Sequence, residues 1–393
     1  FVDEFRDKNI TGICFHQGLA KEELNKFIFL MNKDVKILFE KGGLAEVLSE
    51  ENVGHITVHR VIVAAASEQK KKLLDGLFSH EKREKGRKIF FEGIETIGKV
   101  VEKTKTGEKV SFKGVQKIIQ MMIDNIFLDK GVLQGLTAIK NYDEYTYNHS
   151  VNVAIFSLAL GTELSLNRSQ LSSLGVASIL HDVGKVRIPT AITQKPGLLT
   201  EEEWNIVKNH PIDSVKILSD IGEIDTLAMV VAFENHIGYD FSGYPPVKET
   251  RDLHIFSRIV CIADFYDATT TFRFYHKPLL PDKAVSLIIK RSGTYFDPFL
   301  VKVFVNMIGI FPIGTLVRLD SDELGIVYRI NRNNLFRPKI IIVQPGDNRS
   351  VEELDASSLV DLTEIDEQTR KFKKSVVETL EPLKYNIDVT KYF

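Results

Sequence analysis

Residues 174–185, LGVASILHDVGK, decide the fold class and the chemistry expected of this chain. The first part is apolar with helical spacing, so that residues such as Ala177 and Leu180 face a core. His181 and Asp182 then stand at the end of that buried helix. An unpaired charge is costly in such a place, and a bound cation would compensate it directly. The stretch therefore predicts a helical core with a metal-competent pair inside it.

Two other histidines belong to segments of the same kind. His149 shares an apolar helical stripe with Val153 and Phe156. His210 is expected to end a helix that begins with a capping box, Thr200 and Glu203, and that points Trp204 and Val207 inward. Both imidazoles are therefore expected to face the protein interior.

The candidate ligands recur along the chain at intervals of roughly thirty residues, each next to an apolar helix. The two that remain are His236, in ENHIGYDFSGYP, and Asp264, after the run SRIVCIA. A single histidine of this type is best interpreted as a hydrogen-bonded core residue. The whole set favours a metal site on which successive helices converge their ligands.

Charge and composition exclude several classes of function. The 51 basic and 53 acidic residues give a net charge of −2, so no overall field attracts a nucleic-acid polymer or an anionic membrane. The apolar runs are shorter than the roughly 18 to 20 residues that span a bilayer, so no membrane segment is expected. Cys14 and Cys261 are too few for a disulfide scaffold, which favours a reducing, cytoplasmic location.

The pattern along the chain predicts a mainly α protein with small additions at both ends. Residues 1–64 read as a strand, two helices and a strand, an α/β regulatory module, and 65–113 as a charged helical connector. Helical periodicity dominates from about residue 115 to 307, which predicts a helical domain over 114–311. Residues 312–393 are expected to form a small β-rich extension followed by a C-terminal amphipathic helix or tail over 366–383.

Five motifs in a fixed order resemble one known family. They are YTYNHSVNVA (145–154), HDVGKVRIP followed by KPG (181–197), NHP (209–211), SGYP (242–245) and ADFYDATTTFRFY (263–275). As an ordered set they resemble the HD-GYP subgroup of the HD-domain phosphohydrolases, over about half of the chain.

The resemblance implies an HD-type helical bundle that hydrolyses cyclic di-GMP, a bacterial second messenger, to linear diguanylate or on to GMP. A metal-activated hydroxide would attack the phosphodiester at a di-metal centre. Imidazole and carboxylate ligands suit two divalent transition-metal ions, iron first and manganese second. The implied ligands of the first ion are His149, His181, Asp182 and Asp264, and those of the second are Asp182, His210 and His236, so that Asp182 bridges the two ions.

Positions beside these predicted ligands point to groups on the substrate side. Asp182 and Lys185 are the candidate catalytic residues, and Lys185 is expected to contact the phosphate or to assist the leaving oxygen. Arg273 is the candidate for a bidentate phosphate clamp, Tyr244 for stacking on a purine, and Asp267 for a contact at the edge of the site through water. The alternatives are structural ion pairs for Lys185 and Arg273 and a packed surface turn for Tyr244.

This chain departs from the family at several positions. Asn235 stands where the family has a second histidine ligand, Phe241 replaces a loop glycine, and Phe272 replaces an acidic residue before Arg273. Tyr145 occupies the position of a glutamate that binds a third ion in some members, so at most two metals are expected. An amide is a weaker ligand than imidazole, and Asn235 is therefore retained as a candidate ligand of the second ion.

Three functions stay open at this point. The first is a working cyclic di-GMP phosphodiesterase. The second is a degenerate sensor that binds the dinucleotide without turnover, which Asn235 favours. The third is a hydrolase of another cyclic dinucleotide. The partners considered are a second copy of the chain and a diguanylate cyclase or other signalling protein.

Overall fold

The computed structural model describes residues 10–16, 18–31, 44–51, 53–60, 80–128, 135–137, 145–221, 224–248, 251–271, 278–347, 349, 354 and 356–393. The chain divides into two compact units, Phe1–Asp75 and Gly76–Phe393. Arg273 and Phe272 lie outside the described residues, as does the predicted connector up to residue 79.

The first unit is a small α/β module, as predicted. Strands β1 (Ile10–Phe15) and β2 (Ile56–Arg60) pair antiparallel, and helices α2 (Lys21–Met31) and α4 (Leu44–Glu50) lie between them in sequence. Its core combines helix residues such as Phe27 and Leu48 with the strand residue Ile56. The alternation of apolar side chains along β2 and the helical spacing in α2 therefore bury one common face.

The second unit is a helical bundle that carries a small sheet, which confirms the predicted fold class. The helices before the metal-competent pair are α6 (His80–Thr106), α7 (Lys113–Leu128), α9 (Tyr145–Glu163) and α10 (Arg168–Leu180). Those after it are α11 (Thr190–Thr193), α12 (Glu201–Val207), α13 (His210–Ile221), α14 (Thr226–Glu234), α15 (Ile255–Thr270), α16 (Pro281–Lys290) and α17 (Pro298–Ile308).

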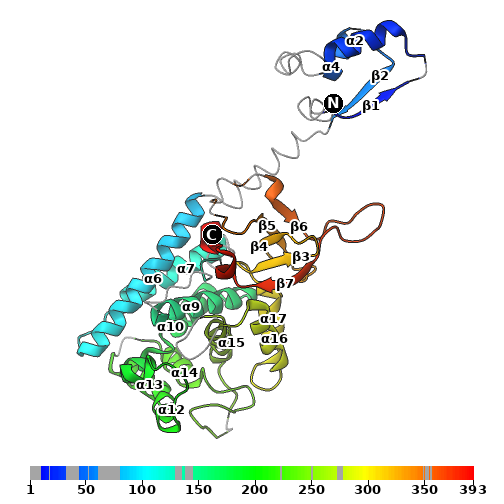
Figure 1. The fold of residues 1–393 in the computed structure, drawn as a ribbon. Coiled ribbons are helices and arrows are strands. Elements are labelled where there is room, and N and C mark those ends of the chain that lie inside the picture. The colour runs from blue at the N-terminus through cyan, green and yellow to red at the C-terminus, as the bar shows by residue number, and fades with distance from the viewer. Residues whose placement is uncertain are drawn as a thin grey trace. The chain divides into compact units, whose positions relative to one another are not determined.

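Helix α9 is the centre of this bundle. It packs against α6, α10 and α15, and α10 in turn packs against α14 (Figure 1). Its residues from Val151 to Leu160 are all buried, because apolar side chains stand on every side of this run, and they enclose the polar Asn152 and Ser157 as well. A polar residue on α9 that faces α10 or α15 is therefore enclosed by helices.

The sheet of the extension is antiparallel, with the strand order β6-β5-β4-β3-β7. Its strands are β3 (Leu316–Leu319), β4 (Leu324–Arg329), β5 (Lys339–Val343), β6 (Leu359–Asp361) and β7 (Val376–Leu380). Two short 3-10 helices, Pro382–Tyr385 and Val389–Tyr392, follow the last strand.

The predicted C-terminal helix over 366–383 is wrong. Residues 376–380 form β7, which pairs with β3 in the register Leu316↔Leu380 and Val317↔Thr379. The apolar spacing of this stretch is compatible with either element, and the ladder with a strand about sixty residues away in sequence decides it. Within the part of the chain that the structure describes, no helix is long and apolar enough to cross a membrane.

Candidate metal centre

His181 and Asp182 stand at a tight junction between two helices. α10 ends at Leu180 with His181 as its C-cap, and Asp182 precedes the 3-10 helix Val183–Arg187. The next glycine, Gly184, lies so close to α13 that a Cβ atom there would be 2.1 Å from the carbonyl oxygen of His210. Its amide donates to Ser214 Oγ at 2.8 Å. The glycine of HDVGK thus lets the chain approach the first turn of α13, which brings His210 beside Asp182.

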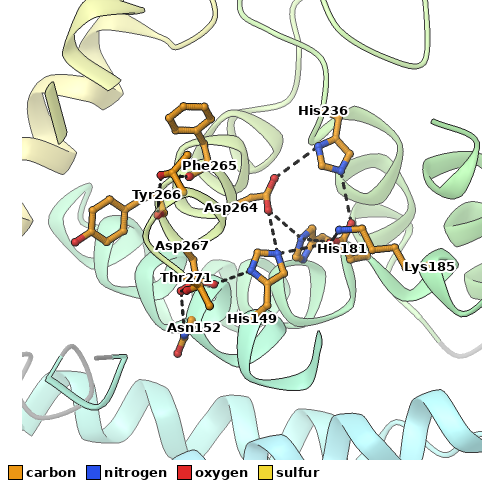
Figure 2. Close-up of polar contacts among 12 residues, drawn as sticks. His149, Asn152, His181, Lys185, His236, Asp264, Phe265, Tyr266, Asp267 and Thr271 are labelled. Carbon is orange, nitrogen blue, oxygen red and sulfur yellow. Dashed lines mark hydrogen bonds and ion pairs between the residues drawn. The ribbon is translucent and has the colours of Figure 1, made fainter. Parts of the chain in front are cut away.

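The first cluster joins α9, α10 and α15. Nε2 of His149 lies 3.0 Å from Asp264 Oδ1 and 3.6 Å from Asp182 Oδ2 (Figure 2). Nε2 of His181 lies 3.2 Å from Asp182 Oδ2 and 3.8 Å from Asp264 Oδ1. One ligand atom from each of these four buried residues lies within 4.8 Å of the others. The predicted ligands of the first ion are therefore close enough to share a single cation.

The second cluster uses the other carboxylate oxygen of Asp182. Asp182 Oδ1 lies 3.0 Å from His210 Nε2 and 3.5 Å from His236 Nε2. The two imidazole nitrogens lie 3.0 Å apart, and Nδ1 of His236 is 3.6 Å from Asp264 Oδ2. Asp182 thus belongs to both clusters, which is the arrangement that the resemblance implied for a bridging ligand.

Hydrogen bonds on the outer side of the rings fix which nitrogen faces inward. Nδ1 of His181 donates to the carbonyl oxygen of Ser178, and Nδ1 of His210 donates to that of Val207, each at 2.7 Å. Each ring then offers an unprotonated Nε2 to the centre when the histidine is neutral. Among the described residues, His181 Nε2 and Asp182 Oδ1 are buried and lack a hydrogen-bond partner. Inward lone pairs of this kind, next to carboxylates, fit a divalent metal ion.

The charges around these groups are strongly shifted. Burial alone would raise the pKa of Asp182, but His181 and Lys185 hold it well below the ordinary value. Burial would lower the pKa of His149, yet Asp182, Asp264 and Asp267 raise it to about 10. Burial lowers the pKa of His236. The carboxylates of Asp182 and Asp264 thus stay ionised inside the protein and favour positive charge on the groups around them.

Asp267 lies behind His149 rather than at the edge of the site. Its Oδ2 accepts a hydrogen bond from His149 Nδ1 at 2.7 Å, its Oδ1 accepts one from Asn152 Nδ2 at 2.9 Å, and the residue is 1% exposed (Figure 2). The predicted contact with substrate is therefore wrong. Asp267 and Asp264 share one face of α15 but meet different nitrogens of the same imidazole, so Asp267 is a positioning residue.

Asn235 caps the C-terminus of α14 and is 1% exposed. In the described part of the chain, neither atom of its amide has a hydrogen-bond partner. Its neighbour Glu234 accepts hydrogen bonds from the His254 amide and from Ser257 Oγ, which ties the end of α14 to the start of α15. The amide oxygen of Asn235 can therefore still accept a bond from another group. Its role as a metal ligand stays a prediction.

Lys185 and Tyr244 lie at the outer side of the clusters. Nζ of Lys185 forms an ion pair with Asp182 Oδ2, and its side chain is 25% exposed. Tyr244 stacks on the His236 ring, with centroids 4.8 Å apart and planes inclined by 25°. One face of Tyr244 is thus occupied by a candidate ligand, so any base must use its other face.

Steric contacts explain why a glycine stands in the SGYP motif. Gly243 has φ +99°, and a Cβ atom there would lie 2.2 Å from the carbonyl oxygen of His236. That carbonyl accepts hydrogen bonds from the Tyr244 amide and from the Tyr295 hydroxyl, each at 3.2 Å. Phe241, the noted departure from the family, has φ +62°, a region that favours glycine. The loop is therefore folded tightly over His236.

The side chain of Tyr145 lies outside the described residues.

Trp204 was expected to face the core, and this prediction is wrong. The capping box on Thr200 and Glu203 is present, but Trp204 is 43% exposed and its ring meets that of Tyr244 edge to face, with centroids 5.8 Å apart. Helix α12 is too short for its apolar spacing to define a buried face. The prediction that His210 ends this helix is also wrong, since α12 ends at Val207 and His210 is the first residue of α13.

Comparisons with known proteins cover the part of the chain that contains both clusters. Residues 121–300 match a family model described as HD domain. Cyclic di-GMP phosphodiesterase PA4108 of Pseudomonas aeruginosa is 35% identical over 208 residues, which are 53% of this chain and 50% of that protein. Cyclic di-GMP phosphodiesterase PdeB of Borreliella burgdorferi is 32% identical, over 50% of this chain and 52% of that protein.

A third relative carries a different substrate in its name. The 3'3'-cGAMP-specific phosphodiesterase 2 of Vibrio cholerae is 32% identical over 48% of this chain and 36% of that protein. The chain spans about half the length, or less, of these curated relatives.

Proposed function

We propose, from the premise that residues 121–300 of this chain form an HD domain, that the protein hydrolyses a cyclic dinucleotide at a two-metal centre. The proposed substrate is cyclic di-GMP and the product is linear diguanylate, or GMP after a second cleavage. Relatives named as cyclic di-GMP phosphodiesterases support this substrate, and the relative named as specific for 3'3'-cGAMP supports another cyclic dinucleotide as the alternative.

The observation that carries the proposal is the shared position of Asp182. Its two oxygens face two separate groups of buried imidazoles, and Asp264 completes the first group. Four histidines gather around Asp182 and Asp264, and cations among them would balance the buried carboxylates and use the imidazole nitrogens that face inward.

The proposed cofactors are two divalent transition-metal ions, iron first and manganese second. When bound, such ions neutralise the charge on phosphodiester oxygens and lower the pKa of water into the neutral range. The first would be held by His149, His181, Asp182 and Asp264, and the second by Asp182, His210 and His236. The amide oxygen of Asn235 is the further proposed ligand of the second ion.

The side chains of this chain contribute orientation and charge. Asp267 keeps the Nδ1 proton on His149, so that the lone pair of Nε2 can coordinate a cation. Lys185 is the cation at the exposed edge of the buried carboxylates, so its ammonium group can meet an incoming phosphate and the leaving sugar oxygen. The tight loop at Gly243 holds His236 in place from the substrate side.

A sensor is the second candidate, and Asn235 is the observation that favours it. An amide in place of an imidazole weakens the second ion, and without that ion the dinucleotide could bind without being cleaved. The first unit, with residues 1–64, would then transmit occupancy to a partner, either a second copy of the chain or a diguanylate cyclase, in the cytoplasm. In the enzyme the same unit would regulate turnover.

One experiment separates these functions. Manganese- or iron-loaded protein is incubated with cyclic di-GMP, and the products are separated by chromatography. We expect metal-dependent formation of linear diguanylate that His181→Ala abolishes and that His55→Ala, a matched change in the first unit, leaves intact. Binding without product would establish the sensor, and neither binding nor product would reject both.

A gain-of-ligand variant tests the role of Asn235. Asn235→His restores an imidazole at the second cluster, so we expect tighter binding of the second ion and faster turnover, measured by metal titration and by the same product assay. An unchanged metal affinity would show that position 235 is not a ligand.

A further inference from the structure

Trp204 is the only tryptophan of the chain, and its ring contacts that of Tyr244. It belongs to α12, whose start is fixed by the capping box of Thr200 and Glu203. Lys195 Nζ forms an ion pair with Glu203 at 2.6 Å, which ties the preceding loop to the residue next to Trp204. The indole therefore has a defined position although 43% of the residue is exposed.

A row of aromatic contacts connects Trp204 to a candidate metal ligand. The indole meets Tyr244 with ring centroids 5.8 Å apart and planes inclined by 80°, and Tyr244 stacks on His236 at 4.8 Å. The indole is thus two ring contacts away from an imidazole of the second cluster. Because an edge-to-face contact uses at most one face of each ring, Tyr244 leaves at least one indole face unstacked.

We infer that Trp204 stacks against a purine base of the cyclic dinucleotide and thereby sets the affinity for substrate. This inference rests on the proposed function. Base stacking on aromatic side chains needs an exposed ring with a free face, and it favours large bases. Within a nucleotide, one sugar separates the base from its phosphate, so a base on the indole leaves the phosphate free to extend past Tyr244 toward Lys185 and the clusters.

The contribution belongs to binding and not to the chemical step. The indole carries no charge and no group that could move a proton at the phosphate. A base that stays stacked from the bound state to the transition state lowers KM and leaves kcat unchanged. Trp204 is therefore expected to select purine dinucleotides over smaller diesters.

The test uses the full chain loaded with manganese. Because the chain has one tryptophan, its emission reports on position 204 alone. We expect quenching within the mixing time when cyclic di-GMP is added in a stopped-flow instrument, before turnover. In steady state, Trp204→Ala should raise KM for cyclic di-GMP about tenfold or more, with kcat within about twofold of the wild type. Trp204→Phe keeps a ring and should recover most of the affinity.

Ile206→Ala is the matched control. Ile206 is exposed on the same short helix, and residues two apart on a helix point to different sides. KM of this variant should equal that of the wild type, and the melting temperatures of all variants show that they are folded.

Two results overturn the inference in different ways. Turnover by wild-type protein with no change in emission, and with an unaltered KM in Trp204→Ala, would reject Trp204 as the stacking residue and leave the proposed function intact. Neither turnover nor a change in emission in the wild type would reject the proposed function and this inference together. Quenching without turnover would support the inference in the sensor.

Discussion

Asp267→Asn changes one atom and tests whether His149 is a metal ligand. Asp267 accepts hydrogen bonds from His149 Nδ1 at 2.7 Å, Asn152 Nδ2 at 2.9 Å and Thr271 Oγ1 at 3.3 Å. An asparagine offers only one acceptor oxygen. If that oxygen faces His149, its NH₂ group opposes the NH₂ group of Asn152. If it faces Asn152, His149 must accept at Nδ1 and carry its proton on Nε2, where coordination is then blocked.

The expected size follows from the role of such partners. Loss of a group that orients a metal-bound histidine weakens metal affinity by about 10- to 100-fold, which corresponds to about 1.4–2.7 kcal/mol. We therefore expect isothermal titration of manganese into metal-free Asp267→Asn to give a dissociation constant higher by that factor for the first ion. The second ion contacts neither Asp267 nor His149 in the proposed arrangement, so its affinity should change less.

Two further variants separate this effect from general damage. Asn152→Ala removes one donor but leaves the carboxylate on His149, so metal affinity should stay near the wild-type value. The double variant Asn152→Asp with Asp267→Asn restores matched donors and acceptors, since the carboxylate introduced at position 152 would accept from the new amide while the oxygen of that amide faces His149. It should recover part of the affinity. An Asp267→Asn protein that binds manganese as tightly as the wild type would refute the proposed orientation of His149.

Two other predictions concern the SGYP loop and the first unit. Gly243→Ala places a methyl group 2.2 Å from the His236 carbonyl oxygen at φ +99°. We expect loss of turnover and a loss of stability larger than the about 1–2 kcal/mol that a left-handed alanine costs. Gly293→Ala, at φ +78° with nothing within 4 Å, should show only that smaller loss in chemical denaturation, and an equal loss in the two variants would contradict the steric argument. Hydrogen bonds from the Ala20, Gly54 and His55 amides hold the pKa of Glu23 at about 2, below the ordinary 4.5, so its stabilisation is complete above about pH 4.5 and is lost as the pH falls toward about 2. In hydrogen exchange, the Gly54 amide should be better protected in the wild type than in the Glu23→Gln variant, and this difference should shrink as the pH falls toward about 2. A difference in protection that does not change with pH would count against the carboxylate as its cause.

Much of the fold could be predicted because local pattern and tertiary packing agree in it. The apolar run before His181 is a helix of the core, and the Thr200 capping box begins α12 as its sequence indicates. The convergence of the candidate ligands was also predictable, since each follows or lies within a buried helix. The resemblance to a known family supplied the division of these candidate ligands into two groups, which spacing alone does not define.

The errors come from places where local pattern does not decide. Asp267 shares a helix face with Asp264, and the sequence cannot tell which nitrogen of an imidazole each carboxylate meets. The helical spacing of Trp204 and Val207 predicted a buried face, but the seven-residue helix α12 has no buried residue. Residues 376–380 join a sheet because β3 is available as a partner, a contact that depends on the distant chain.

Anomalous diffraction from crystals grown with manganese tests the central claim most directly. The account predicts a peak in contact with His149, His181, Asp182 and Asp264, and a second peak, weaker because of Asn235, in contact with Asp182, His210 and His236. Manganese-replete crystals with no peak among these six side chains would contradict it.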